Sequence, residues 1–163
     1  MLSGPIPKSM GNLNFSFLFD VSRNKLEGDA SFLFGKSKAV STMDLSRNQF
    51  EFDISRVEFS TNLTTLDLNH NKIYGSLPSS LTKLALQSFN VSYNRLCGAI
   101  PQGGRLQEYD MYAYFHNKCL CGAPLPPCKW LSQNKGNADT HWIIPIGVCN
   151  LSLFPLILRI KDM

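Results

Sequence analysis

Cysteines are the residues whose type and spacing most clearly could do chemistry in this 163-residue chain. Cys97, Cys119, Cys121 and Cys128 lie close together in the sequence, and four cysteines admit three disulfide pairings. The short, proline-rich segment between Cys121 and Cys128 favours a small loop closed by that pair, which leaves Cys97 for Cys119. Four reduced thiols or a zinc site are the alternatives. The C-x-C…C spacing does not fit the paired ligands of most zinc sites, so no metal site is predicted.

Catalytic patterns are absent from the sequence. The histidines, His70, His116 and His141, lie in different sequence contexts, and no G-x-S-x-G or paired-histidine motif occurs. The carboxylates belong to repeated positions rather than to a pocket. The sequence therefore predicts neither an enzyme nor a cofactor site. The net charge of +4 is spread thinly, and the absence of a Lys/Arg run gives no indication of nucleic-acid binding.

A regularly spaced asparagine identifies the elements that must position these residues. Around each copy the sequence follows L-xx-L-x-L-xx-N-x-L-x-G-x-I-P, which is the leucine-rich repeat pattern, and a partial copy, LSGPIP, begins at Leu2. A repeat at fixed spacing is typical of stacked coils. The asparagines are Asn24, Asn48, Asn71 and Asn94, in steps of 24, 23 and 23 residues.

Each repeat predicts one short strand followed by a turn. Apolar residues at alternate positions, such as Leu66 and Leu68, place one side of a strand in the core. A buried asparagine can bond the backbone groups that the turn leaves unpaired, so the asparagines should stack in a ladder. Because one coil cannot bury its apolar edge alone, the chain should form an α/β solenoid. We expect a right-handed leucine-rich-repeat superhelix with a parallel β-sheet on the concave face, 3-10 or short helices and turns on the convex face, and a disulfide C-cap.

The chain divides into three predicted parts. Residues 1–96 should form about four repeats, the first of them partial, and residues 97–129 should end the last repeat and form the cysteine-rich cap. Residues 130–163 form an atypical tail, disordered or weakly hydrophobic. Its apolar stretch is interrupted by Pro145 and Pro155 and is shorter than the ~20 residues that a membrane helix needs, so membrane association is not expected.

The polar strand positions are expected to form a flat, rigid wall that suits docking of a protein, because its side chains are held before binding. The aspartates in successive coils either contact a basic surface of a partner or are simply the usual residue at this position of the repeat. The predicted partner-binding residues are Asp20, Ser22, Arg23, Thr42, Asp44, Ser46, Arg47, Thr65, Asp67, Asn69, His70 and Ser88.

N-x-S/T sequons occur at Asn14, Asn62, Asn90 and Asn150. Asn62 lies just before a predicted strand, on the rim of the wall, and together with Asn14 is a predicted glycosylation site. Asn90 occupies the same position as Asp67 on the concave face. A glycan there would obstruct docking, so low occupancy is expected.

Several segments resemble the plant polygalacturonase-inhibiting proteins, an extracellular leucine-rich repeat family. They are LDLNHNKIYGSLP from Leu66, NVSYNRLCGAIPQGG from Asn90 and YFHNKCLCGAPLPPCK from Tyr114. FEFDISRVEF, from Phe50, breaks the G-x-I-P pattern in the same way as that family. The resemblance is to the C-terminal half of the family.

The resemblance implies a secreted protein of the plant cell wall or apoplast, with the pairings Cys97–Cys119 and Cys121–Cys128. It implies a fungal or insect polygalacturonase as the partner, docked on the concave face where His70 matches an enzyme-contacting residue, and pectin as a second ligand to consider. A truncated, inactive form and a signalling, developmental or receptor-ectodomain protein are the alternatives. Since LSGPIP opens inside a repeat, without the apolar segment of a secretion signal, Met1 is predicted to be an internal start or the product of a truncated gene model.

Overall fold

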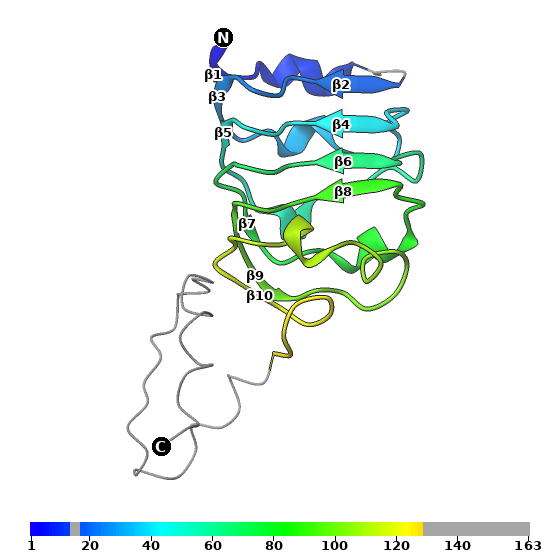
Figure 1. Ribbon diagram of the computed structural model, residues 1–163. Helices are drawn as coiled ribbons and strands as arrows, with labels where there is room; N and C mark the ends of the chain where they lie inside the picture. The colour runs from blue at the N-terminus through cyan, green and yellow to red at the C-terminus, as the bar shows by residue number, and fades with distance from the viewer. Residues whose placement is uncertain (14–16, 129–163) are drawn as a thin grey trace, which may run out of the picture.

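Four short strands form the parallel sheet that the repeats predict. The computed structural model describes residues 1–13 and 17–128, and Figure 1 shows these strands stacked one per coil along the solenoid. They are β2 (Leu18–Asp20), β4 (Thr42–Asp44), β6 (Thr65–Asp67) and β8 (Ser88–Asn90), hydrogen-bonded in that order. The leucine-rich-repeat solenoid with a parallel sheet is thus confirmed.

A second set of parallel strands follows the asparagine turns, and the repeat pattern had not predicted it. β1 (Ser3–Pro5), β3 (Lys25–Gly28) and β5 (Gln49–Phe50) form one sheet. β7 (Tyr74–Gly75), β9 (Arg95–Ala99) and β10 (Cys119–Cys121) form another. An isolated bridge between Asp53 and Tyr74 lies where the two sheets meet. Stacking places these extended segments side by side, so they pair although each is only two to five residues long.

Short 3-10 helices complete the coils, as expected for the convex side. They are η1 (Lys8–Asn12), η2 (Ser31–Leu33), η3 (Ile54–Arg56), η4 (Ser79–Lys83) and η5 (Met111–Ala113). In the described part of the chain, no helix is long and apolar enough to cross a membrane.

The core consists of the apolar repeat positions. Leu66 is fully buried and Leu68 is 1% exposed, and the equivalent residues Met43, Leu45, Phe89 and Val91 are also buried. Each coil therefore contributes the same two inward side chains on its concave strand. Their burial against the coils above and below is what stabilises a unit too small to fold alone.

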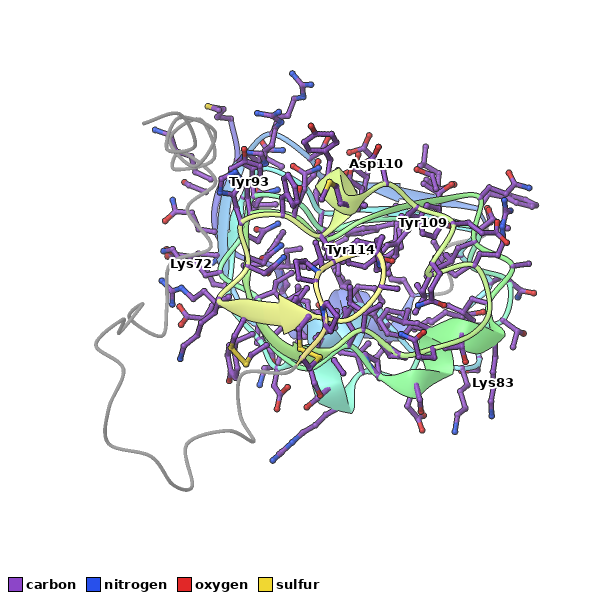
Figure 2. All side chains as sticks on the ribbon, turned by 60° about the horizontal axis from the view of Figure 1, so that its bottom comes forward. Lys72, Lys83, Tyr93, Tyr109, Asp110 and Tyr114 are labelled. Atoms are coloured by element: carbon purple, nitrogen blue, oxygen red, sulfur yellow. A yellow bond between two sulfur atoms is a disulfide. The ribbon has the colours of Figure 1, made fainter. Side chains whose placement is uncertain are left out.

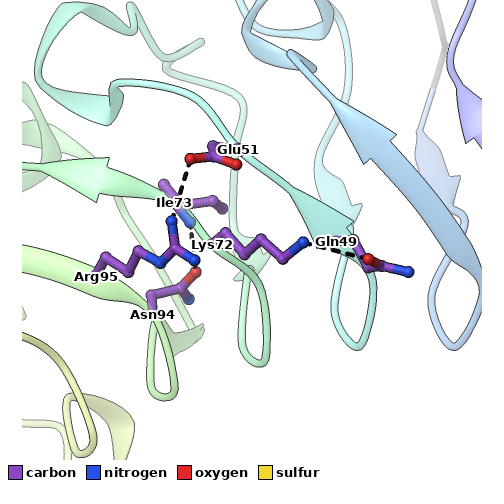
Figure 3. Close-up of polar contacts among 6 residues, drawn as sticks. All are labelled: Gln49, Glu51, Lys72, Ile73, Asn94 and Arg95. Carbon is purple, nitrogen blue, oxygen red and sulfur yellow. Dashed lines mark hydrogen bonds and ion pairs between the residues drawn. The ribbon is translucent and has the colours of Figure 1, made fainter.

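The predicted asparagine ladder is present and one rung longer than expected. Asn94 is 8% exposed, accepts from the N–H of Ile73 at 3.0 Å and donates to the carbonyl of Leu68 at 2.8 Å. Figure 3 shows the contact to Ile73. Asn117 repeats this arrangement, accepting from the N–H of Leu96 at 3.0 Å and donating to the carbonyl of Val91 at 3.0 Å. The coil geometry thus continues into the cysteine-rich segment.

The ladder is flanked by polar contacts between coils, one joining adjacent coils and one spanning two coil steps. Arg95 Nη1 lies 3.1 Å from Glu51 Oε1, and Lys72 Nζ donates to Gln49 Oε1 at 3.2 Å (Figure 3). These side chains are largely exposed, and exposed ion pairs contribute little to stability, so the asparagines rather than these pairs fix the stacking.

Two disulfides and a buried tyrosine form the C-terminal cap. Cys97 pairs with Cys119, joining β9 to β10, and Cys121 pairs with Cys128, which are the pairings expected from the sequence. Tyr114 is 1% exposed and donates from its hydroxyl to the carbonyl of Leu106 at 2.6 Å. Figure 2 looks onto this end of the solenoid and shows Tyr114 within the coil cross-section. The predictions for residues 130–163 lie outside the described residues.

Candidate protein-binding face

The concave strands hold their polar side chains in straight columns. Parallel pairing sets Thr42 beside Thr65 and Thr65 beside Ser88, and it sets Asp20 beside Asp44, Asp44 beside Asp67 and Asp67 beside Asn90. On each strand, the residue between the Thr/Ser column and the Asp/Asn column points into the core, because successive strand residues face opposite sides. The result is an open polar wall whose side chains are fixed by the coil spacing of about 4.8 Å.

The aspartate column has a structural role within each coil. Oδ1 of Asp20 accepts from the N–H of Ser22 at 2.8 Å, and Oδ1 of Asp44 accepts from the N–H of Ser46 at 2.9 Å. The other two coils repeat the contact, from Asn69 to Asp67 and from Ser92 to Asn90, each at 3.0 Å. Each of these side-chain oxygens therefore begins the turn after its strand. This local contact explains the recurring aspartate, and whether the column also meets a partner stays a prediction.

Ser46 and Asn69 are poor candidates for direct contact, contrary to the sequence-based expectation. Ser46 is 5% exposed and Asn69 is 9% exposed, while Ser22 is half-buried. The alternation was assumed to continue past the strand, but the chain turns inward at this position toward the next asparagine. After the turn, the side chain that points outward belongs instead to the residue directly before that asparagine.

This residue forms a second column along the rim of the wall. Arg23, Arg47, His70, Tyr93 and His116 all have left-handed backbone geometry, with φ between 54° and 58°. Residues other than glycine rarely adopt this geometry, and the stacked backbone holds one such residue in it at every coil. In each case the backbone N–H donates to a backbone carbonyl of the next coil. Arg23 donates to Ser46, Arg47 to Asn69 and His70 to Ser92. The column is therefore a rigid row in which each coil presents one side chain.

Three rings of this row stack face to face. The ring centroids of His70 and Tyr93 lie 4.0 Å apart with 14° between their planes. Those of Tyr93 and His116 lie 4.2 Å apart with 22° between planes. His116 is not among the predicted site residues, because the sequence contexts of His70 and His116 differ. The 23-residue steps from 70 to 93 to 116, each just before an asparagine, are the signal that would have found it.

A chain of hydrogen bonds orients the first ring. Asn69 Nδ2 donates to Asp67 Oδ1 at 2.5 Å, and since a carboxylate only accepts, this contact fixes the amide. Asn69 Oδ1 then lies 2.6 Å from His70 Nδ1, so Nδ1 carries the proton. His70 Nε2 has no hydrogen-bond partner among the described residues. The imidazole therefore presents one defined nitrogen at the rim.

Electrostatics of the face change from coil to coil. Burial raises the pKa of the Asp67 carboxyl, with Asp44 adding to the rise and the contacts from Asn69 and the charge of Arg47 opposing it. Burial lowers the pKa of His70, helped by Arg47 and His116 and opposed by Asp67. The acidic column ends at Asp67, because Asn90 replaces the aspartate in the next coil.

The asparagines of the N-x-S/T sequons differ in their position. Asn62 is exposed, just before the strand β6, and its Nδ2 reaches the carbonyl of Lys38 at only 3.5 Å. Asn90 is half-buried in the wall, and its Oδ1 accepts from both the N–H and the hydroxyl of Ser92. Asn14 lies outside the described residues. Occupancy at Asn62 and Asn14 stays a prediction.

The described residues offer little for catalysis or metal binding. No group of three His, Cys, Asp or Glu side chains in residues 1–13 and 17–128 could hold a metal ion. A depression of about 480 Å³ is lined by convex-side residues such as Phe34, Phe52 and Tyr74 rather than by the concave columns. Among the described residues, the concave wall is thus an open surface, and this depression lies elsewhere on the coil.

Comparisons with known proteins agree with this description. Residues 62–84 match the family model Leucine Rich Repeat. The chain is 62% identical over 118 residues to Polygalacturonase inhibitor 1 of Arabidopsis thaliana, covering 72% of this chain and 36% of that protein. It is 62% identical over 110 residues to the Polygalacturonase inhibitor of Pyrus communis, covering 68% of this chain and 33% of that protein. It spans about a third of the length of these relatives.

A solved structure shows the same fold. The crystal structure of a plant ice-binding protein is 55% identical and superposes with a TM-score of 0.77, covering 80% of this chain and 42% of that one. The repeat pattern, the parallel sheets, the C-terminal disulfides and these relatives lead to one assignment. The chain is a polygalacturonase-inhibitor-like leucine-rich repeat protein.

Proposed function

We propose that this protein binds a polygalacturonase of a fungal or insect attacker on its concave face and blocks access of pectin to that enzyme. The observation that carries the proposal is the 62% identity over 118 residues to a polygalacturonase inhibitor. The chain acts by binding, with no catalytic step and no cofactor. Pectin itself is a second candidate ligand, because it is the substrate that the bound enzyme would hold.

The geometry of the wall supports this role. Thr42, Thr65 and Ser88 form one polar column, and Arg47 and His70 stand beside it on the rim. Interlocked coils hold all five residues in place before a partner arrives, so little conformational entropy is lost on binding. Tyrosine and arginine side chains dominate the binding energy of many protein interfaces, which favours Arg47 and Tyr93 as strong contacts.

The same features support an extracellular location, in the plant cell wall or apoplast. Two disulfides close the C-terminal cap, and such bonds persist in oxidising compartments. Asn62 is exposed in an N-x-T sequon, as secretory glycosylation requires. Within this arrangement, residues 1–96 supply the repeats and most of the docking wall, and residues 97–129 close its end.

A reducing-sugar assay with the full chain and purified fungal and insect polygalacturonases tests the proposal. We expect release of reducing ends from polygalacturonate to fall as the chain is added. Arg47→Glu should weaken this inhibition. Lys83→Glu is the matched control, because Lys83 is an exposed cation of η4 on another side of the coil (Figure 2). Unchanged pectin cleavage at micromolar concentrations of the chain would defeat the proposal.

Ice binding is a second candidate, favoured by the 55% identity to the plant ice-binding protein. Inhibition of ice recrystallisation by the purified chain would support it. Ice crystals that coarsen at the same rate with and without the chain would remove it, and neither result depends on the enzyme assay.

A further inference from the structure

Aromatic contacts extend beyond the stacked rim into the C-terminal cap. After His70, Tyr93 and His116, the rings of His116 and Phe115 meet edge to face with centroids 6.2 Å apart. Phe115 in turn meets Tyr112 edge to face at 4.8 Å. We call this series the five-ring ladder: His70, Tyr93, His116, Phe115 and Tyr112.

The five-ring ladder is both held in place and open to another molecule. Backbone hydrogen bonds tie its coils together, from the N–H of Asn71 to the carbonyl of Tyr93 and from the N–H of Tyr93 to that of Phe115. Tyr93 is 44% exposed and Tyr112 is 67% exposed. Figure 2 shows Tyr93 at the edge of the coil, away from the buried Tyr114. Rigid, partly exposed aromatic side chains are what protein interfaces use for their strongest contacts.

Charged residues of both signs accompany the ladder. Arg47 precedes His70 in the same row, and Lys118 follows His116 in the sequence and is exposed. On the acidic side, Asp67 faces His70, and Asp44 lies one strand further away. Asn90 replaces the aspartate in the coil of Tyr93. Asp110 is occupied at the start of η5, where its Oδ1 accepts from the N–H of Tyr112 at 3.0 Å.

We propose that the five-ring ladder is a docking surface for an acidic segment of the partner protein, and that it binds this segment more tightly when the imidazole of His70 is protonated. The inference rests on the proposed function, because it names the chemistry of the partner at the same face. Its aromatic rings supply contact area, and the imidazole of His70 supplies charge that depends on pH. An imidazolium next to Tyr93 is further stabilised by the ring face.

The direction of the pH effect follows from the groups around His70. In the free chain, burial, Arg47 and His116 disfavour the protonated imidazole of His70, and Asp67 favours it. A partner carboxylate near Nε2 would favour the charged imidazole. Binding would then take up a proton, so affinity should rise as the pH falls through the imidazole range. The rise should end near pH 4, where the partner's own carboxylates become protonated.

Binding of a hepta-aspartate peptide to the full chain at pH 5.0 and pH 7.5, in the same salt, tests the proposal. One exposed charge pair should give an affinity roughly 1.4- to fivefold higher at pH 5.0. The double variant His70→Gln/His116→Gln should lose this ratio, whereas Lys83→Gln, at an exposed cation on another side of the coil, should keep it. Equal affinity at both pH values, or a ratio that survives in the double variant, would overturn the proposal.

A second measurement guards against a variant that simply misfolds. In ¹H–¹³C spectra of the unaltered chain, peptide addition at pH 5.0 should shift the Cε1–Hε1 signals of His70 and His116. Binding without such shifts would also overturn the docking surface.

Failure of the inference and failure of the proposed function are distinguishable. Polygalacturonase inhibition without hepta-aspartate binding would retain the inhibitor function and remove the ladder as its acidic-segment site. Peptide binding at the ladder without inhibition of any enzyme tested would retain the ladder and remove the inhibitor function.

Discussion

The side chain of Asn94 accepts a hydrogen bond from the backbone N–H of Ile73, in the preceding coil, at 3.0 Å. The same side chain donates to the carbonyls of Leu68, Val91 and Ser92 at 2.8 to 3.2 Å. One buried amide thus bonds the turn of its own coil and the backbone of its neighbour. This relationship, repeated at each asparagine, holds the rim residues of the candidate site at a fixed spacing.

Asn94→Ala should be strongly destabilising, because it leaves several buried backbone groups without partners. An unsatisfied buried group costs about 1–3 kcal/mol, so a loss of about 2–4 kcal/mol in the free energy of unfolding is expected. Urea unfolding followed by circular dichroism measures it. Asn62→Ala, at an exposed asparagine, is the control and should stay within about 0.5 kcal/mol of the unaltered chain. A similarly small change at Asn94 would contradict the ladder's role.

Tyr114→Phe should destabilise the cap. The ring would remain packed, but the buried carbonyl of Leu106 would lose the donor that now lies 2.6 Å away. We expect a loss of about 1–3 kcal/mol in the free energy of unfolding. Tyr112→Phe, at a tyrosine 67% exposed, serves as the control. Equal melting temperatures for the two variants would show that the Tyr114 hydroxyl contributes nothing.

Burial raises the pKa of the Tyr114 phenol, in keeping with a hydroxyl that stays neutral. Its protonated form is favoured in the folded chain, so the cap should lose stability as the pH rises above about 10, where an unfolded tyrosine ionises. Tyr114→Phe should flatten this alkaline loss, which thermal unfolding between pH 8 and pH 11 would detect.

The two disulfides should differ in their contribution to stability. Cys97 and Cys119 are separated by 22 residues, and Cys121 and Cys128 by 7. By the entropy of the closed loop in the unfolded chain, removing the first bond should cost about 3.4 kcal/mol and the second about 2.5 kcal/mol. Pairwise Cys→Ala variants, compared in denaturant unfolding, test the order. The first bond also joins β9 to β10, so a smaller loss there would contradict its role in the cap.

Asp67→Asn should stabilise the chain at neutral pH. The raised pKa of Asp67 means that the folded chain favours the protonated carboxyl, so stability is lost as the pH rises through the unfolded value near 4. Asparagine keeps an oxygen for the N–H of Asn69, as Asn90 does for Ser92. Thermal unfolding of both chains should show an advantage for the variant at pH 7 that shrinks toward pH 3. An advantage that grows toward low pH would contradict this sign.

The sequence by itself determined the solenoid, its concave sheet and the asparagine ladder. These follow from local periodicity, because Leu66 and Leu68 can be buried only if every coil repeats the same pattern. The position of His70 on the rim also follows from its place before Asn71.

Tertiary structure alone decided the rest. The outer strands β3, β5, β7 and β9 pair only because stacking brings short extended segments together, and no single segment has a strong strand pattern. The burial of Ser46 and Asn69 depends on where the chain bends after the strand. The stacking of His70, Tyr93 and His116 joins residues 23 positions apart, so their contact exists only once the coils are superimposed. Local sequence specifies which residues each coil presents, while the spacing between coils decides which of them touch.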